Sequence, residues 1–364
     1  MKNVFFHLKK IDKCLLLIPI LISLFGLIEI WSASKGNFLN FKKQIFFLIL
    51  GVILMILISF FDWRILKENS FLILGLYFFS IFLLVLVLFL GPTIRGVRGW
   101  LKIGSLSFEP IELTKFSLLL LFSRYFSLRH IELYSIKHIL ISAFYIFIPA
   151  LLVFLQPDFG SFLILIFLWV FILFFSGIKL RHFLILVLIG LLIFTFSFEK
   201  ILKPYQKERI LTFFKLKISD PLTTSWSQNQ AKIAIGSGGF FGKGINKGSQ
   251  TQLGFLPEPQ TDFIFSVICE EMGFLGAFIL FFLYSFLFLI ILRMSFSSIS
   301  NFEKLFSGGF LAILFSQIFL HLGSNLSLLP VVGIPLPFVS YGGSNLIVNF
   351  LILGILQSIK VHGR

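Results

Sequence analysis

Long apolar runs follow one another along the whole chain and constrain its fold more than any other feature of the sequence. Runs of about 17 to 25 residues are long enough to cross the hydrocarbon core of a bilayer as helices. Only 13% of the 364 residues are charged, whereas soluble domains carry about a quarter, so one core cannot hide the apolar surface. We therefore predict an all-α integral membrane protein with about ten transmembrane helices. The predicted spans are 13–33, 42–60, 70–90, 110–127, 137–155, 160–177, 180–198, 262–292, 304–328 and 343–360.

The formal net charge of +15 is better explained by membrane topology than by nucleic-acid binding. Lysine and arginine gather in alternate short loops, and an excess of basic residues marks the cytoplasmic loops. This bias predicts a multi-pass protein of the cytoplasmic (inner) membrane with both termini in the cytoplasm. Residues 199–261 then form a large extracytoplasmic loop between the seventh and eighth helices. We interpret the whole chain, 1–364, as a single polytopic membrane domain and expect no nucleic-acid partner.

A glycine-rich segment, 234–244, lies within this loop. It is similar to a nucleotide-binding P-loop, but that motif needs glycine at Ser237 and serine or threonine at Gly244. A nucleotide site is therefore excluded. The backbone N–H groups could still hold a phosphate, helped by Lys243 and Lys247.

Charged and polar side chains recur at helical spacing inside several spans, where they are costly and mark function by default. Glu109, Glu112 and Lys115 are three residues apart, so they share one helix face, and Glu112 can pair with Lys115. A structural ion pair and a substrate-binding role are equally supported. Two further rows are spaced every four residues: Gln317, His321 and Asn325, and Asn345 with Asn349. For Gln317 and His321 we favour hydrogen bonds between helices.

Two acids stand where the chain enters an apolar run. Asp158, in Gln156-Pro157-Asp158-Phe159-Gly160, is best explained as a helix cap. Asp262 could also cap the long run that follows it, and spacing alone favours this capping role over a catalytic one. The segment 329–344 holds three prolines and a Gly-Gly pair but is too apolar for a solvated loop. It indicates a re-entrant or interfacial segment.

Basic residues give the predicted outer face a positive character. Residues 205–218 mix basic and apolar side chains, which suits a helix lying in the membrane interface against anionic lipids. Arg95, Arg98 and Lys102 add to this charge. An anionic, lipid-linked substrate is the partner that such a surface favours.

Six segments spread over nearly the whole chain carry polar or glycine- and proline-containing motifs. They are Gly99-Trp100-Leu101 leading to 108–115, then 156–160, 230–239, 248–253, 256–265 with Glu270-Glu271, and 335–344. Together, and in this order, they resemble the SEDS family of multi-pass membrane proteins, the FtsW/RodA/SpoVE group. Residues 248–253 are more similar to the elongation branch, RodA, than to the division branch.

The resemblance implies a peptidoglycan glycosyltransferase of cell-wall elongation, which adds lipid II to a nascent glycan strand and releases undecaprenyl pyrophosphate. It implies a class B penicillin-binding protein, a transpeptidase, as partner, together with the elongation machinery. Gln260 stands where the family often has histidine, so the role of general base falls to Asp262. The substrate-binding candidates are Glu112, Lys115, Trp100, Arg95, Arg98, Arg209, Lys243, Asp158 and Ser340.

No cofactor is certain. A divalent cation, Mg²⁺ or Mn²⁺, could bridge the pyrophosphate to a carboxylate. Two cysteines and six scattered histidines show no ligand spacing, so the metal ligands are unknown.

Two other functions remain open from the sequence. A flippase for lipid II would also need polar faces and broken segments inside a helical bundle, but it would need no base. A non-catalytic membrane scaffold for the crosslinking transpeptidase would depend on its outer surface and not on its interior. Substitution of Asp262 separates both from the glycosyltransferase.

Overall fold

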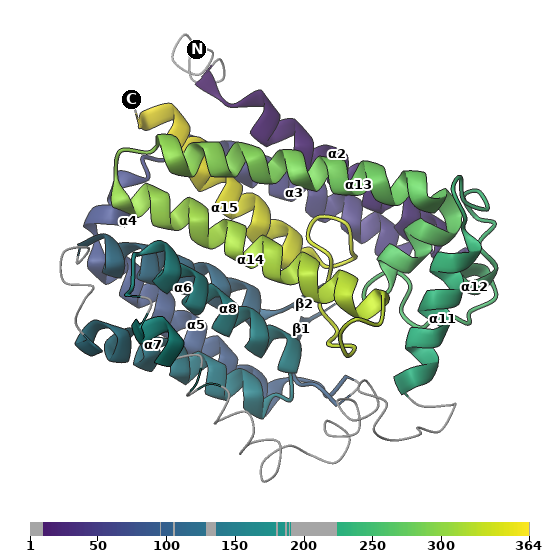
Figure 1. Cartoon of the computed structure of the whole chain (residues 1–364), viewed down its shortest axis with the longest axis horizontal. Helices are drawn as coiled ribbons and strands as arrows, with labels where there is room; N and C mark the ends of the chain where they lie inside the picture. Colours follow the sequence, from purple (N-terminus) through teal and green to yellow (C-terminus); the bar gives the residue numbers. More distant parts are fainter. Residues whose placement is uncertain are drawn as a thin grey trace.

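The computed structural model describes residues 10–94, 96–104, 106–128, 136–179, 181–185, 188, 190 and 224–363. They form a bundle of long helices with one small β-hairpin (Figure 1). The helices are α2 (Lys13–Ser32), α3 (Leu39–Phe60), α4 (Arg64–Glu68), α5 (Ser70–Leu90), α6 (Pro110–Leu128), α7 (Ile136–Leu155), α8 (Phe159–Phe175), α11 (Thr224–Ser237), α12 (Ser249–Gln252), α13 (Ile264–Ser297), α14 (Asn301–Asn325) and α15 (Gly343–His362).

The predicted spans match these helices, apart from 180–198, which lies largely outside the described residues. Seven described helices are long and apolar enough to cross a membrane: α2, α3, α5, α7, α13, α14 and α15. The 17-residue α8 is apolar but shorter, and α6 carries Glu112, Lys115 and Arg124. The all-α membrane fold is therefore confirmed, whereas the count of ten spans stays a prediction.

α14 and α15 form the centre of the bundle. Over an apolar stretch of 18 residues in each of these helices, 83% of the residues are buried. In α5 the corresponding share is 28%, so α5 presents most of its surface outward. Figure 1 shows α14 and α15 between α13 on one side and α5, α6, α7 and α8 on the other. Small residues permit close approach, as when Gly51 of α3 receives the ring of Phe350 and Gly343 of α15 receives that of Phe47.

The two ends of the bundle differ in the chain segments that they contain. At one end, here called the terminal end, the backbone N–H of Asp12 donates to Gln357 Oε1 at 2.9 Å, and Gln357 Nε2 donates back to Asp12 O at 2.8 Å. The start of α2 and the end of α15 therefore lie together. Whether this end faces the cytoplasm is a prediction that the fold leaves untested.

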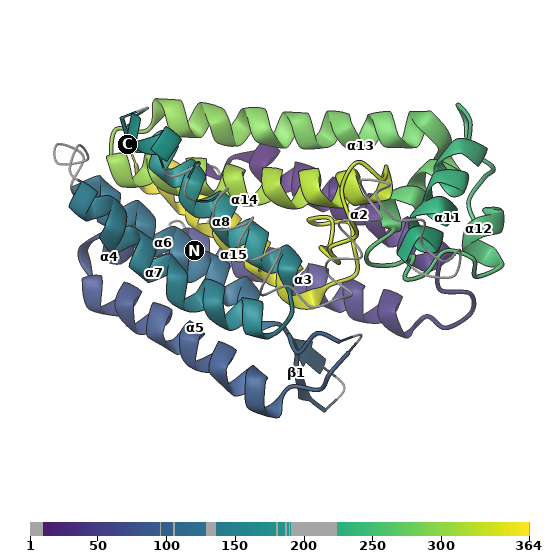
Figure 2. The ribbon, with the colours of Figure 1, turned by 60° about the horizontal axis from the view of Figure 1, so that its bottom comes forward.

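The opposite end, here called the loop end, holds the irregular structure. A hairpin pairs β1 (Leu101–Ile103) with β2 (Leu106–Phe108), placing Leu101 opposite Phe108. α11, α12 and the segment 326–342 gather there too. Figure 2 shows the hairpin, α11 and α12 at the end of the bundle away from the C-terminus. Chain segments that are distant in sequence thus meet at the loop end.

Candidate functional site

The turn that carries Asp262 is fastened by its backbone. Three successive carbonyl oxygens each accept one hydrogen bond: Gln260 from Tyr341 N at 2.8 Å, Thr261 from Ser340 Oγ at 2.7 Å, and Asp262 from Asn325 Nδ2 at 2.9 Å. All three donors come from the end of α14 and the segment that follows it. Buried backbone carbonyls need partners, and here they bind a remote part of the chain. The position of Asp262 is therefore set by tertiary contacts.

Asp262 is not the N-cap of α13. The helix begins at Ile264, its N-cap is Phe263, and that residue makes no side-chain capping bond. The capping interpretation of Asp262 is therefore wrong. A Cβ placed on Gly333 would lie 3.8 Å from Asp262 Oδ2, so the carboxylate lies beside the backbone of the 326–342 segment.

Glu109, one residue before α6, links the acids of the loop end. Its backbone N–H donates to Ser344 Oγ at 3.0 Å, which ties the start of α6 to the start of α15. Burial first, then the charges of Glu112 and Asp158, raise the pKa of Glu109 well above its ordinary value of 4.5. Lys115 opposes this shift and Asp262 adds to it, so all four groups lie within electrostatic range of Glu109.

The side chain of Glu109 is half-buried. The protein around it still removes enough water to weaken the solvation of its charge, which raises its pKa. Carboxylates that share such a site resist simultaneous ionisation. The predicted residues Asp262, Glu112, Lys115 and Asp158 are thus brought into one electrostatic neighbourhood.

The predicted pair of Glu112 and Lys115 is confirmed. Lys115 Nζ lies 2.7 Å from Glu112 Oε1, and both side chains are almost fully buried. One helical turn separates them on α6, as their spacing predicts. A buried pair of this kind is weak support for stability by itself, so a role toward a ligand stays open.

Asp158 caps α8, as predicted, through a hydrogen bond from Ser161 N to its Oδ1 at 3.0 Å. Burial raises the pKa of this carboxyl above 3.8, while the bonds from Ser161 oppose the shift. The turn also contacts the hairpin region, because Arg98 N donates to Gln156 O at 3.2 Å. Asp158 therefore serves the fold and also adds negative charge beside Glu112 and Lys115.

Other substrate-binding candidates fall into accessible, buried and undescribed positions. Arg98 is exposed, and Trp100 is half-buried directly before β1, so both remain accessible at the loop end. Ser340 is buried and uses its hydroxyl on the backbone, accepting from Leu336 N at 2.8 Å as well as donating to Thr261 O. Arg95, Arg209 and the predicted interfacial helix 205–218 lie outside the described residues.

The glycine-rich segment fills a break in α13. At Gly273 the backbone leaves helical geometry, with φ 69° and ψ −162°. The freed carbonyls of residues 270 and 271 accept from the N–H groups of 243 and 244 at 3.0 and 2.9 Å. The freed N–H groups of 274 and 275 donate to the carbonyls of 239 and 240 at 2.9 and 3.1 Å. A Cβ at Gly238 or Gly242 would overlap a carbonyl of α13, which explains the glycines.

This arrangement corrects the suggestion that the segment cradles a phosphate. The N–H groups at 243 and 244 already bind helix carbonyls. Lys243 Nζ contacts Ser249 Oγ at 2.9 Å and Glu270 Oε1 at 3.2 Å, which favours a structural role for this lysine.

Glu270, fully buried, holds the next part of the loop. Its carboxylate accepts from Gln250 N at 2.8 Å, Thr251 N at 3.0 Å and Thr251 Oγ1 at 2.9 Å, in addition to Ser249 and Lys243. The described part of the loop is therefore an ordered layer on the first turns of α13. The sequence shows Glu270 and Glu271 as an acid pair inside an apolar run, but it does not indicate which groups they bind.

The polar rows inside the last two spans behave differently from the expectation. His321 Nδ1 donates to Ile334 O at 2.8 Å, in the 326–342 segment, and neither amide atom of Gln317 has a hydrogen-bond partner among the described residues. Bonds between helices are therefore wrong for both. Asn349 Nδ2 donates to Asn345 Oδ1 at 2.9 Å within α15. Asn325 does join two helices, α14 and α13.

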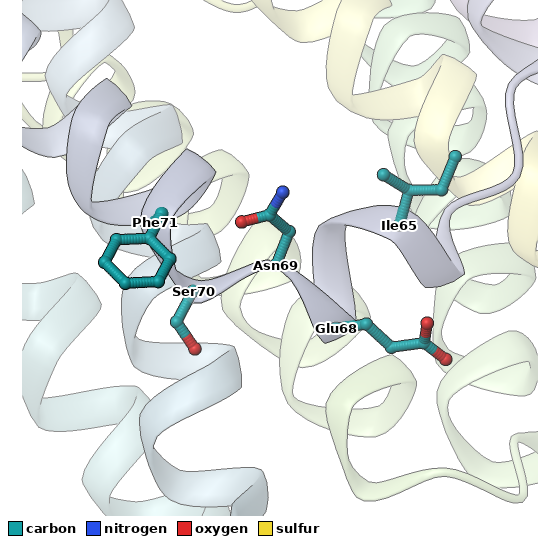
Figure 3. A pocket seen from close by; sticks show the side chains of 5 residues that line it. All are labelled: Ile65, Glu68, Asn69, Ser70 and Phe71. Atoms are coloured by element: carbon teal, nitrogen blue, oxygen red, sulfur yellow. The ribbon is translucent and has the colours of Figure 1, made fainter.

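A pocket of about 420 Å³ lies elsewhere, where α4 meets α5 at the terminal end (Figure 3). It is open to the surface and lies at the terminal end, whereas Asp262 lies at the loop end. We assign the candidate site to the loop end, where the acids, the ion pair and the fastened turn meet. The pocket is lined by Ile65, Glu68, Asn69, Ser70 and Phe71.

The fold and the site together define a polytopic helical membrane protein with buried charges gathered at one end of the bundle. The chain matches the Cell cycle protein family of FtsW, RodA and SpoVE over residues 12–364. It is 35% identical over 363 residues to the peptidoglycan glycosyltransferase MrdB of Escherichia coli K12, which covers 100% of this chain and 97% of that protein. It is 31% identical over 362 residues to stage V sporulation protein E of Bacillus subtilis, covering 97% and 98%.

Solved structures agree. Crystalline RodA of Thermus thermophilus superposes with a TM-score of 0.72 at 30% identity, covering 97% of each chain. A chain from a peptidoglycan synthase complex that coordinates polymerization and crosslinking gives 0.83 at 32% identity, covering 96% of this chain and 97% of that one. This chain therefore belongs to the SEDS (FtsW/RodA/SpoVE) family, and the resemblance drawn from its sequence is confirmed.

Proposed function

We propose that this chain is a peptidoglycan glycosyltransferase that extends glycan strands from lipid II during cell-wall elongation, with Asp262 as its general base. Its family and its relatives support the activity. The observation that carries the assignment to Asp262 is the turn held on three successive carbonyls, with its carboxylate beside Gly333 and within electrostatic range of Glu109. A base must be held at a fixed position to remove one particular proton.

The chemistry needs few groups. The 4-hydroxyl of the acceptor sugar attacks C1 of the donor sugar, while the bond from C1 to the pyrophosphate oxygen breaks. The hydroxyl proton passes to Asp262, and the electron pair leaves with undecaprenyl pyrophosphate. Positive charge must stabilise that leaving group. Lys115 and Arg98 are the described cations that we assign to it.

A divalent cation fits this site only through the substrate. Among the described residues no group of three or more metal-ligating side chains is close enough together to hold an ion. Mg²⁺ is commonly held by one or two carboxylates together with substrate phosphates. We infer that Mg²⁺ or Mn²⁺ would arrive with the pyrophosphate and contact one acid of the loop end, where it would help to neutralise the leaving group.

The loop end is proposed to face the extracytoplasmic side, with both termini in the cytoplasm. The distribution of lysine and arginine supports this orientation. A structural relative works in a complex that joins polymerization to crosslinking. We therefore propose a class B penicillin-binding protein as the partner of this chain, within the elongation machinery.

The test is polymerisation of fluorescent lipid II by the purified chain, with and without its class B partner. The proposal predicts glycan polymer from the wild-type chain and a loss of about 100-fold or more in Asp262→Ala, which is the scale of a lost general base. A full rate in Asp262→Ala would defeat the assignment of the base, and full rates in both Asp262→Ala and Glu112→Ala would defeat the whole site. A flippase would instead move labelled lipid II across proteoliposomes without forming polymer, and a scaffold would do neither.

A further inference from the structure

The start of α13 receives a capping hydrogen bond from a side chain of another helix. Its N-cap, Phe263, has no polar side-chain atom, yet the first backbone N–H groups of a helix lack partners inside the helix. The missing acceptor comes from Asn325, the last residue of α14. Asn325 Oδ1 accepts from Ser266 N at 3.2 Å and from Ser266 Oγ at 2.7 Å. A residue from another helix therefore caps α13.

The nitrogen of the same amide binds the other side of the cap. Asn325 Nδ2 donates to Asp262 O at 2.9 Å and to His321 O at 2.9 Å. The side chain is fully buried. An asparagine amide offers two donors and one acceptor oxygen with two lone pairs, and all four positions are used. Reversing the amide would direct its oxygen at two carbonyls, so its orientation is determined.

Asn325 thus contacts the backbone at Asp262, directly before Phe263, and at Ser266, three residues after it. Within this turn, the donors Tyr341 N and Ser340 Oγ bind the carbonyls of residues that precede Asp262. Asn325 alone among these three donors joins Asp262 to the first turn of α13, through Ser266. It therefore fixes the direction in which the chain enters α13, and with it the place of the Asp262 side chain.

We propose that Asn325 is a positioning residue for Asp262 that acts through the backbone without touching the substrate. The proposal rests on the proposed function of Asp262 as general base. A base displaced by about 1 Å can lose about 100-fold in rate, because the reacting atoms no longer meet at attack distance. Residues that support the catalytic group from behind set this precision.

The experiment compares Asn325→Ala and Asn325→Asp with the matched control Asn349→Ala in lipid II polymerisation with the partner present. Asn349 is an equally buried asparagine that donates to Asn345 within α15. Asn325→Asp keeps the acceptor for Ser266 but loses, when ionised, the donor to Asp262 O. We expect kcat to fall about 10-fold to 100-fold in both Asn325 variants, with KM for lipid II within about 2-fold of the wild type. Asn349→Ala should keep its kcat.

A structural role alone would give a different pattern. If Asn325 only stabilised the fold, the folded fraction would work at the wild-type kcat, and Asn325→Ala would match Asn349→Ala. That result would overturn the positioning role. Should Asn325→Ala not fold, Asn325→Asp decides at a pH where its new carboxyl is ionised, and wild-type kcat under that condition would also overturn it.

Hydrogen exchange gives a second readout. The backbone amide of Ser266 should exchange faster in Asn325→Ala, which removes its acceptor, and unchanged exchange would contradict the proposal. Failure of the proposed function is separate, because it would appear as wild-type polymerisation in Asp262→Asn. If Asp262→Asn is inactive and Asn325→Asp is fully active, Asp262 is supported as the general base and only the positioning role of Asn325 is overturned.

Discussion

Lys115 Nζ lies 2.7 Å from Glu112 Oε1 on one face of α6, and the two side chains are 3% and 5% exposed. Charges inside a membrane helix are costly unless they are paired or face the interior of a bundle. Both conditions hold here, because α6 is packed against α5 and α14. The pair lies close enough to Asp158 and Glu109 to affect the charge of both. It therefore joins the structure of the bundle to the electrostatics of the loop end.

Substitutions in this pair should separate its contribution to stability from its contribution to lipid II polymerisation. Lys115→Met leaves Glu112 buried without its partner, and such changes cost about 3–5 kcal/mol. The double variant Glu112→Gln/Lys115→Met removes both charges and should recover most of that stability. Thermal unfolding in detergent measures the recovery. We expect the double variant still to polymerise lipid II poorly, because the leaving pyrophosphate loses Lys115. Full polymerisation by a stable double variant would show that the pair is only structural.

The glycine segment should tolerate alanine at one position and not at another close by. At Gly238 a Cβ would overlap Cys269 O, whereas at Gly236 nothing lies within 4 Å. Gly236 is also inside α11, where alanine is preferred by up to about 1 kcal/mol. Gly238→Ala should therefore lower the free energy of unfolding by about 1–3 kcal/mol, and Gly236→Ala should leave it equal or higher. Equal stability of the two variants would contradict the insertion of this segment into α13.

Removing the Glu270 carboxylate should loosen the loop. Glu270→Ala leaves buried donors at Gln250 and Thr251 without their acceptor, and each such group costs about 1–3 kcal/mol. Limited proteolysis should then cut between residues 238 and 256. Glu303→Ala is the control, because Glu303 is also buried but lies in α14 at the terminal end. Protection of the loop in Glu270→Ala would show that the carboxylate does not hold it.

Stability should depend on pH through Glu109. Its pKa in the folded protein is raised above the ordinary 4.5, so between these two values the native state binds more protons than the unfolded state. The free energy of unfolding then falls as the pH rises through this window. Glu109→Gln removes the titration, so its stability should decline less from pH 4.5 towards neutral pH. Thermal unfolding across this range compares the two proteins, and identical slopes would contradict the raised pKa.

The sequence predicted what depends on local periodicity. The face shared by Glu112 and Lys115 and the cap at Asp158 follow from spacing within a few residues, and the structure confirms both. The apolar runs likewise gave the described helices, because bilayer thickness fixes their length.

Contacts between distant segments were not predictable in this way. Asn325 and Asp262 are 63 residues apart, and nothing in either segment indicates that one holds the other. The glycine segment shows the same limit. Its composition indicated close approach of a backbone, but the approaching group is a broken helix and not a phosphate. Gln317 and His321 have helical spacing, yet their polar atoms do not join helices.

The most direct test of the account is the initial rate of lipid II polymerisation by Asp262→Asn, with the class B partner present and unfolding temperature checked in parallel. Asparagine keeps the size of the side chain but cannot accept the hydroxyl proton. Glu68→Gln, at the pocket of the terminal end, is the matched carboxylate control. We predict a loss of about 100-fold or more in folded Asp262→Asn and wild-type rates in Glu68→Gln. A wild-type rate in Asp262→Asn would contradict the assignment of the general base.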